Sequence, residues 1–422
     1  MKNNPKFSIL IPTRNGGKYL PYCLESILSQ DYDDVEIIIS NNRSEDETNS
    51  YLNTITDKRV KTIQPTEVLS MADNYEFVLA QATGDWIMIL GDDDAVQSYF
   101  FELVEFLTKK AEEKKINLIN SFRSYFFWDG CEFLHSDNML NYHARAFYTI
   151  ESTKYQVLTL LSGQKPYFET PQMYTTSLFN RKIIERVKYL QDGRFYTTIT
   201  PDANAAAIAC SVENKYIDCK IPIAWVGTSP KSYGVMGEAW HGRKDSAEAE
   251  MQKRIREMAH LALVKDSHSW HPLSGNIKIC SAVLYYWESL LHCEKLQSAI
   301  FKKIITSSPV KTLAFSSILR ELQDDTKTQE QRLEWLKEIC DINDIAFKHV
   351  EFVQKRILPY LVFIFNKLDY KKNRKYRKAD GIYYEIKRND ENKDMTIIDA
   401  CSIVKELENE KQLVTQLIGD KK

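Results

Sequence analysis

The chain has 422 residues, 43% of them hydrophobic and 12% aromatic, which excludes a disordered protein and leaves room for a catalytic domain with a further region. Its formal charge of −2 at pH 7 gives no global basic field, so we expect no nucleic-acid partner. No apolar run approaches the ~20 residues of a membrane-spanning helix.

The first predicted elements alternate between strand and helix. Residues 7–12 form a short β-branched run that predicts a strand, and residues 13–17 form a polar loop behind it. Apolar side chains then recur at helical spacing over residues 20–28. Residues 35–40 predict a second strand, and residues 44–47 (Ser-Glu-Asp-Glu) form a capping box that predicts the start of a second helix.

The alternation continues along the chain. Residues 59–63 predict a weaker third strand, 71–79 a helix, 86–90 a fourth strand and about 96–114 another helix. Strands separated by helices of this length imply right-handed crossovers and a parallel sheet, in which ligands bind outside the carboxyl ends of the strands. Three polar loops fall at such ends: residues 13–17, 41–44 and 91–94. We therefore expect these loops to form one site.

The third of these loops carries three consecutive carboxylates, Asp92, Asp93 and Asp94, directly after an apolar strand. Clustered acids repel one another and are costly to desolvate. A hard divalent cation removes that cost, and Mg²⁺ or Mn²⁺ held by one or two carboxylates and substrate phosphates is a common arrangement at phosphate-handling sites. The alternative is a solvated acidic turn that caps the following helix, whose first turn favours negative charge.

The rest of the chain has less regular patterns. Residues 117–128 are aromatic and extended, residues 150–230 mix helix and strand, and residues 227–242 are rich in small residues. The chain then becomes mainly helical and charged. We therefore predict an α/β domain over residues 1–245 and a mainly helical C-terminal region over residues 246–422.

Several motifs that follow one another in a fixed order carry a family resemblance. They are Phe7-Ser-Ile-Leu-Ile-Pro-Thr-Arg-Asn15, Leu24-Glu-Ser-Ile-Leu-Ser-Gln30, Ile37-Ile-Ile-Ser-Asn-Asn-Arg-Ser-Glu-Asp46, Ala82-Thr-Gly-Asp-Trp86 and Gly91-Asp-Asp-Asp94. Together they resemble the nucleotide-binding half of a family 2 glycosyltransferase with the GT-A fold, a Rossmann-like, mostly parallel sheet flanked by helices. The resemblance is strongest over residues 6–100 and extends to about residue 240.

The resemblance implies a nucleotide-diphosphate sugar as donor, with a UDP-sugar favoured. Two sets of residues would contact the donor's nucleoside: Pro12, Thr13, Arg14 and Asn15 in the first loop, and Asn41 and Asn42 in the second. The family usually has at least one Asp in the second loop, which accepts a hydrogen bond from the uracil imide. An Asn oxygen can accept the same bond, and the alternative is an ordinary turn before a helix.

The acidic run resembles the Asp-x-Asp motif of the family. By that resemblance Asp92 contacts the ribose, Asp93 contacts the nucleotide-sugar, and Asp93 and Asp94 are the ligands of Mn²⁺ or Mg²⁺. The metal would neutralise the diphosphate and stabilise it as a leaving group.

Inverting sugar transfer also needs a general base that takes the proton of the acceptor hydroxyl. The resemblance implies a carboxylate well downstream, and the candidate is Asp202, in Thr200-Pro-Asp-Ala-Asn204 at the start of an apolar helical stretch. An acid after Pro at a helix start is also a routine capping arrangement. Asp192, in a turn, is the runner-up.

The small-residue segment 227–242 resembles the loop that closes over the donor in such enzymes, with glycines as hinges. Five of its side chains and near neighbours could then meet the diphosphate: Ser229, Lys231, Ser232, His241 and Arg243. The alternative is a solvated linker before the helical region.

The C-terminal region contains an apolar run, residues 357–365, followed by a basic cluster up to Lys378. This combination suits an anionic membrane surface, so one interpretation is peripheral membrane contact through residues 350–378. The other is a helix packed in the core and followed by a solvated basic loop.

The resemblance implies an inverting, metal-dependent glycosyltransferase that transfers a sugar to a hydroxyl acceptor, a saccharide or lipid-linked saccharide, in surface polysaccharide or lipopolysaccharide biosynthesis. Scattered cysteines and an N-terminus without the apolar core of a signal peptide predict a cytoplasmic protein, with or without peripheral membrane contact. Two alternatives remain. One is a sugar nucleotidyltransferase of the same fold, which would normally show a Gly-rich basic phosphate loop. The other is a non-catalytic relative that acts as a membrane or complex scaffold.

Overall fold

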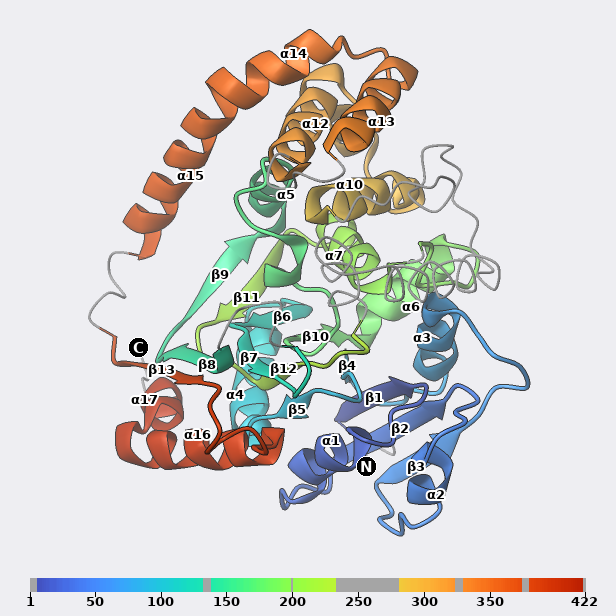
Figure 1. The fold of residues 1–422 in the computed structure, drawn as a ribbon, viewed down its shortest axis with the longest axis vertical. Helices are drawn as coiled ribbons and strands as arrows, with labels where there is room; N and C mark the ends of the chain where they lie inside the picture. The colour runs from blue at the N-terminus through green and yellow to red at the C-terminus, as the bar shows by residue number, and fades with distance from the viewer. Residues whose placement is uncertain are drawn as a thin grey trace.

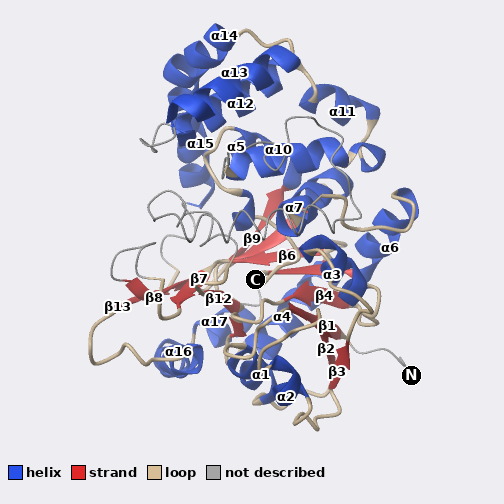
Figure 2. Ribbon diagram, turned by 45° about the vertical axis from the view of Figure 1, so that its right-hand side comes forward, coloured by secondary structure: helices blue, strands red, loops and turns tan. Residues whose placement is uncertain are grey.

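Two β-sheets and the helices around them make up the described part of the chain in the computed structural model (Figures 1 and 2). The described residues are 6–131, 138–198, 200–232, 281–322, 329–373 and 379–419. The larger sheet has eight strands in the order β3-β2-β1-β4-β10-β6-β11-β9, and the smaller has five in the order β13-β8-β7-β12-β5.

The strands of the larger sheet are β1 (Phe7–Thr13), β2 (Val35–Asn41), β3 (Val60–Ile63), β4 (Trp86–Ile89), β6 (Leu118–Ser121), β9 (Tyr148–Ser152), β10 (Ser177–Asn180) and β11 (Lys215–Cys219). The strands of the smaller sheet are β5 (Ala95–Val96), β7 (Ser124–Phe127), β8 (Asn138–Arg145), β12 (Ala224–Thr228) and β13 (Gly381–Lys387). The predicted parallel arrangement is confirmed for the first four strands, since β1 pairs in parallel with β2 and β4, and β2 with β3. Beyond β4 the sheet becomes mixed, because β10 is antiparallel to both of its neighbours.

The first strands are apolar on both faces because helices cover both sides of the sheet. Ile9 and Ile11 of β1 pack into one hydrophobic cluster, and Leu10 between them packs into a second. Successive side chains of a strand point to opposite faces, so a continuous apolar run is what a doubly covered strand requires. Ile37 and Ile38 of β2 divide between the clusters in the same way.

One face of the larger sheet packs against α1 (Leu20–Leu28), α4 (Phe100–Glu113), α16 (Ile397–Lys411) and α17 (Leu413–Gly419). The other packs against α3 (Met71–Leu79), α5 (Thr153–Leu161), α6 (Arg181–Leu190) and α7 (Pro201–Val212). Helices α10 (Ala282–His292), α12 (Ser308–Leu322) and α13 (Gln329–Ile342) contribute buried residues to the same hydrophobic cluster. The remaining helical segments are α2 (Thr48–Leu52), α11 (Ala299–Ile305), α14 (Phe347–Phe352), α15 (Leu358–Lys372) and the short turns η1 (Tyr167–Glu169), η2 (Glu294–Leu296) and η3 (Val353–Ile357). The predicted α/β class with a mainly helical C-terminal region is therefore confirmed.

The last part of the chain returns to the strands of the first part. In Figure 1, α10 to α15 lie above the sheets, whereas β13, α16 and α17 lie beside and below them. β13 pairs antiparallel with β8 along its length, and Ile397, Ala400 and Val404 of α16 are buried in the same cluster as α1. The division into residues 1–245 and 246–422 stays a prediction. Among the described helices, none is both long enough and apolar enough to cross a membrane.

Two predicted helix starts are wrong. The second helix begins at Thr48 without a side-chain cap, since the hydroxyl of Ser44 instead accepts a hydrogen bond from the Asn15 amide. The helix expected from residue 96 begins at Phe100, because Ala95 and Val96 form β5 and pair with β12. The acidic run therefore leads into a strand and does not cap a helix.

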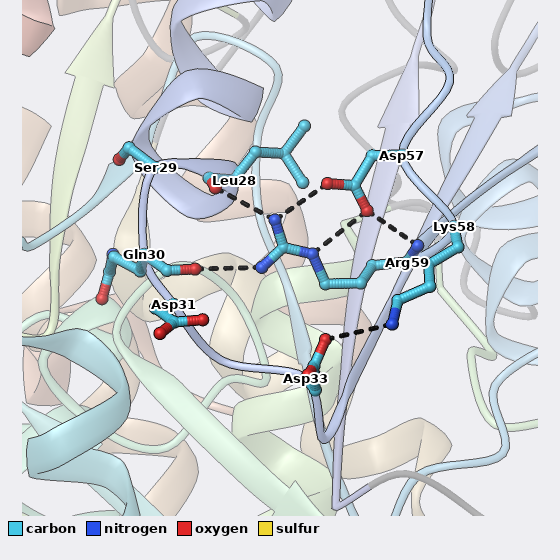
Figure 3. A pocket seen from close by; sticks show the side chains of 8 residues that line it. All are labelled: Leu28, Ser29, Gln30, Asp31, Asp33, Asp57, Lys58 and Arg59. Atoms are coloured by element: carbon cyan, nitrogen blue, oxygen red, sulfur yellow. Dashed lines mark hydrogen bonds and ion pairs between the residues drawn. The ribbon is translucent and has the colours of Figure 1, made fainter.

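A surface pocket lies at the amino ends of β2 and β3, the opposite ends from the acidic run, and Arg59 fills much of it (Figure 3). The guanidinium donates to the carbonyl oxygens of Leu28, Gln30 and Tyr32 and to both carboxylate oxygens of Asp57. It thereby satisfies carbonyls that the end of α1 leaves without helical partners. The bonds from Arg59 also lower the pKa of Asp57. The Arg59 side chain in this pocket therefore connects the end of α1 to the start of β3.

We expect Arg59→Ala to lower the free energy of unfolding by about 2–3 kcal/mol, because it leaves several carbonyls and a carboxylate without their charged donor. Arg59→Lys should recover less than half of the lost stability, since an ammonium lacks the planar arrangement of donors that a guanidinium has. The neighbouring Lys58→Ala is the control: its side chain is 82% exposed, so a change within about 0.5 kcal/mol is expected. Urea unfolding measures all three, and equal midpoints for Arg59→Ala and Lys58→Ala would contradict the assignment.

Candidate functional site

The acidic run follows the carboxyl end of β4, as the sequence predicts, and its three side chains are buried. The relative exposure is 8% for Asp92, 7% for Asp93 and 0% for Asp94. Burial raises the pKa of Asp93, with the charge of Asp92 as the next cause. Burial and then the charge of Asp93 raise the pKa of Asp94 to about 7. The run is therefore not a solvated turn.

Asp94 holds the two sheets together. Its Oδ2 accepts hydrogen bonds from the Gly91 amide at 2.8 Å and the Thr175 hydroxyl at 2.5 Å, and its Oδ1 accepts one from the Gly227 amide at 2.7 Å. Thr175 has a φ of +47°, which is rare for a β-branched residue and places its hydroxyl under the carboxylate. A carboxylate offers about four lone-pair sites, so these three donors leave Asp94 with about one lone-pair site for a metal.

Asp93 faces the segment after β12. Its Oδ2 accepts hydrogen bonds from the hydroxyls of Ser229 at 2.5 Å and Ser232 at 2.7 Å. Its backbone carbonyl accepts one from the Trp128 indole at 2.9 Å. Only a glycine fits opposite that carbonyl, because a Cβ at position 227 would lie 1.6 Å from the Asp93 carbonyl oxygen.

Asp92 faces the first loop. The Thr13 hydroxyl donates to its Oδ2 at 2.5 Å, and the Lys231 ammonium lies 2.9 Å from the carboxylate. A Cβ at Gly16 would lie 2.2 Å from the same Oδ2, so the loop backbone approaches Asp92 closely at this point. The structure thus brings the first loop against the acidic run.

The second loop is joined to the first by hydrogen bonds. The amide of Asn15 donates to the Ser44 hydroxyl at 2.9 Å, and the side chain of Asn15 accepts from the Glu45 amide at 2.8 Å. The amide of Asn42 donates to the Thr13 carbonyl at 2.8 Å. The three polar loops predicted to meet therefore do lie side by side.

The side chains of Asn41 and Asn42 are buried and already bonded within the chain. Asn42 accepts from the Leu69 amide at 2.8 Å and donates to the Leu69 carbonyl at 2.9 Å. Asn41 donates to the Asn49 side chain and accepts from the Ser44 amide. Both side chains therefore organise their own loop. Arg14 in the first loop is exposed, and Pro12 is half-buried.

Asp202 lies in the first turn of α7 after Pro201, where negative charge is favoured. Its carboxylate accepts hydrogen bonds from the Tyr167 hydroxyl at 3.0 Å and the Ala203 amide at 2.9 Å. Burial is the main cause that raises its pKa. Asp192, the runner-up, lies in the turn after α6 with an 83% exposed side chain and pairs with Lys295.

Two tyrosines, Tyr75 and Tyr174, lie beside the acidic run. Burial raises the pKa of Tyr75, and the charges of Asp202 and then Asp94 raise it further. It stacks on Tyr174 with ring centroids 6.4 Å apart, and a Cβ at Gly91 would lie 2.5 Å from the Tyr174 hydroxyl oxygen. Sequence reasoning missed both tyrosines and Thr175, because only the folded chain brings them to the loops.

The donor set is suited to a hard cation that shares its ligands with a substrate. Among the described residues, no three His, Cys, Asp or Glu side chains converge on one metal position. Carboxylate oxygens are the ligands that Mg²⁺ and Mn²⁺ prefer, and Mg²⁺ often keeps only one or two of them beside phosphate and water. The candidate loop residues His241 and Arg243 lie outside the described residues.

Comparisons with known proteins match the N-terminal part of the chain. Residues 8–170 match the family described as "Glycosyl transferase family 2". The glycosyltransferase GlyG of Streptococcus pneumoniae is 29% identical over 114 residues, which is 26% of this chain and 37% of that protein. The GalNAc(5)-diNAcBac-PP-undecaprenol beta-1,3-glucosyltransferase of Campylobacter jejuni is 34% identical over 97 residues, 22% of this chain and 31% of that protein.

The predicted resemblance to family 2 glycosyltransferases is therefore confirmed for residues 8–170. The matches span only about a third of the length of these two relatives.

Two solved structures resemble this one at low similarity. Staphylococcus aureus TarS 1–349 in complex with UDP-GlcNAc has a TM-score of 0.42 and 14% identity, covering 83% of this chain and 90% of that one. The mannosyltransferase PcManGT of Pyrobaculum calidifontis, in complex with GDP-Man and Mn²⁺, has a TM-score of 0.38 and 14% identity, covering 84% and 88%. At these TM-scores the similarity supports no conclusion about the site.

We expect Gly227→Ala to displace β12 from the acidic run, because the added methyl group would overlap the Asp93 carbonyl. The free energy of unfolding should fall by at least about 2 kcal/mol. Gly419→Ala is the control, since its Cβ would meet no atom within 4 Å. Chemical unfolding of both variants measures the difference. A Gly227→Ala protein as stable as Gly419→Ala would show that β12 is not held against Asp93.

Proposed function

We propose that this protein is an inverting glycosyltransferase that moves a sugar from a nucleotide-diphosphate donor to a hydroxyl acceptor. The observation that carries the proposal is the convergence of the first loop, the second loop and the buried acidic run at the carboxyl ends of β1, β2 and β4. This is the edge at which an open α/β sheet binds ligands. The match of residues 8–170 to family 2 glycosyltransferases supports the same class.

In this proposal the nucleoside lies against the first two loops, and the diphosphate lies at the acidic run. Asp92, bonded to Thr13, contacts the ribose. Asp93 contacts the nucleotide-sugar and, with Asp94, binds Mn²⁺ or Mg²⁺. Of these two, Asp93 is the more available ligand, because its Oδ2 is held by two side-chain hydroxyls that can rotate away. A bound cation would supply positive charge to stabilise the leaving diphosphate.

Asp202 is proposed as the base that takes the acceptor proton. Its raised pKa makes its carboxylate a stronger base than an ordinary surface Asp, which favours proton abstraction near neutral pH. The Tyr167 hydroxyl fixes the orientation of the carboxylate. The half-buried Tyr75 and Tyr174, near the acidic run, provide aromatic faces on which a sugar can pack.

A pair of substitutions separates the two roles. A thermal-shift panel of UDP-, GDP- and dTDP-sugars with and without Mn²⁺ first identifies the donor. Asp93→Asn should then weaken Mn²⁺-dependent donor binding about a hundredfold, because the ligand loses its charge. Asp202→Asn should bind the donor within about twofold of wild type, yet lose about 10²–10⁴-fold in turnover.

The products and a metal chelator complete this test. Release of nucleoside diphosphate agrees with glycosyl transfer, whereas release of pyrophosphate would identify a nucleotidyltransferase. Full activity in EDTA would reject the metal. Full activity of Asp202→Asn would reject the base, and a phenotype that survives Asp202→Asn but not loss of the C-terminal helices would favour a scaffold.

The acceptor is proposed to be a saccharide or a lipid-linked saccharide of surface polysaccharide or lipopolysaccharide biosynthesis, reached at a membrane surface. The name of the Campylobacter jejuni relative refers, for that protein, to an undecaprenol-linked saccharide. The structural support here is the continuous helix α14–η3–α15, along the upper left edge of the molecule in Figure 1. The other interpretation, in which the apolar run of residues 357–365 packs in the core, is not what the structure shows, since Leu358 alone in this run is buried.

This helix has an outer stripe of exposed aromatic side chains spaced three, seven and eight residues apart. Phe352, Tyr360, Phe363 and Tyr370 are between 54% and 64% exposed. Exposed basic residues lie along the same helix: Lys348, Lys355, Arg356, Lys367 and Lys371. A helix with exposed aromatic and basic side chains is suited to the boundary between lipid headgroups and acyl chains. We therefore assign this stripe to an anionic bilayer.

We expect the full chain to co-sediment with vesicles that contain phosphatidylglycerol and not with pure phosphatidylcholine vesicles, because the stripe combines cations with apolar rings. The double variant Tyr360→Ser/Phe363→Ser should bind about tenfold more weakly, since two rings no longer leave water. Tyr189→Ser on α6, 87% exposed in the structure, should bind like wild type. Equal binding by the double variant would contradict the assignment. Wild-type dimers that the double variant lacks would assign the stripe to a second copy of the chain.

A further inference from the structure

The acidic run and one short segment of the chain contact each other residue by residue. The Gly227 amide donates to Asp94, the Ser229 and Ser232 hydroxyls donate to Asp93, and the Lys231 ammonium pairs with Asp92. Each of the three carboxylates is thus bonded to the segment from Gly227 to Ser232, which we call the 227–232 segment.

The position of the 227–232 segment is fixed at its start. Gly227 and Thr228 belong to β12 and pair in parallel with Phe126 and Phe127 of β7. The next residues close a tight turn, in which the Ser232 amide donates to the Ser229 carbonyl and the Ser229 amide donates to the Ser232 hydroxyl, each at 2.9 Å. The turn therefore carries Lys231 back over the carboxylates.

The Lys231 ammonium is placed as a counter-ion. It lies 2.9 Å from both oxygens of Asp92, 3.3 Å from the Asn15 carbonyl and 5.2 Å from the centroid of the Tyr19 ring. Its charge opposes the rise in the pKa of Asp93. The side chains of the pair are only 24% and 10% exposed, so solvent screens the attraction incompletely. One lysine thus neutralises part of a charge cluster that is costly to leave unpaired.

We propose that Lys231 is a built-in cation that competes with the divalent metal for the acidic run and must leave Asp92 when the metal and the donor bind. This inference rests on the proposed function, because it takes the acidic run as the metal site. Ser229 and Ser232 both donate to Oδ2 of Asp93, so a metal that binds this oxygen has to displace them. The double charge of a metal at either oxygen of Asp93 would also repel an ammonium held one residue away on Asp92. Metal binding and the docked 227–232 segment therefore oppose each other.

The competition predicts that removal of the lysine charge strengthens metal binding. Lys231→Met keeps the length of the side chain and removes its charge, and we expect it to bind Mn²⁺ about tenfold more tightly than wild type without nucleotide. Lys231→Arg keeps the charge and should bind Mn²⁺ as wild type does. Lys18→Met is the matched control, since Lys18 lies 5.5 Å from the same Tyr19 ring and is exposed. Titration of the full chain with Mn²⁺, followed by the electron paramagnetic resonance of free Mn²⁺, gives the affinities.

A second readout uses stability and not activity. Without metal, Lys231→Met should melt at a lower temperature than wild type, because the carboxylates lose their counter-ion. Mn²⁺ should raise the melting temperature of Lys231→Met more than that of wild type. Equal or weaker Mn²⁺ affinity in Lys231→Met would overturn the competition and leave the proposed glycosyl transfer intact. If neither protein binds Mn²⁺ without nucleotide, the competition is overturned. If neither binds Mn²⁺ when the donor is present, the metal in the proposed function is overturned as well.

Discussion

The burial of three consecutive carboxylates at one sheet edge is the constraint on which the site depends. Buried carboxylates need donors or counter-charges, because desolvation of a charge without them costs several kcal/mol. Each Asp meets this need differently: Asp94 through two backbone amides and Thr175, Asp93 through two serine hydroxyls, and Asp92 through Thr13 and Lys231. The donors come from segments far apart in the sequence, so the acidic run also organises the fold around it.

The smaller sheet brings several of these donors to the acidic run. The larger sheet alone supplies the first two loops, because parallel strands end at a common edge. The smaller sheet adds β5 directly after the run and β12 beside it, and β12 leads into the 227–232 segment. Trp128, just beyond β7, donates to the Asp93 carbonyl and joins this sheet to the run once more. The site is therefore a junction between two sheets.

Local signals explain what the sequence could and could not predict. β1, β2 and β4 were predictable because each is a mainly apolar run that ends in polar or glycine-containing residues, and so was the meeting of the three loops. The signal for β3 was weaker, because Lys61 and Thr62 lie between its two apolar residues. The capping box at Ser44 was misread because its hydroxyl has a tertiary partner, Asn15, that no local pattern reveals. Thr175, Tyr174 and Tyr75 were missed for the same reason. Hydropathy also could not decide whether residues 357–365 are buried, since an apolar helix has the same hydropathy pattern in a core and on a surface.

The kind of donor that each carboxylate has suggests how one acidic run serves both folding and binding. Backbone amides cannot leave Asp94 unless strands move, so that carboxylate is committed to the junction in any state of the site. Hydroxyl and ammonium groups can leave Asp93 and Asp92 by side-chain rotation, at a cost of about 1.5–3 kcal/mol for each bond to a carboxylate. A ligand that supplies new bonds or positive charge to the same oxygens can take their place. The exchangeable charge therefore lies at Asp92 and Asp93, above a third carboxylate that holds the two sheets in register.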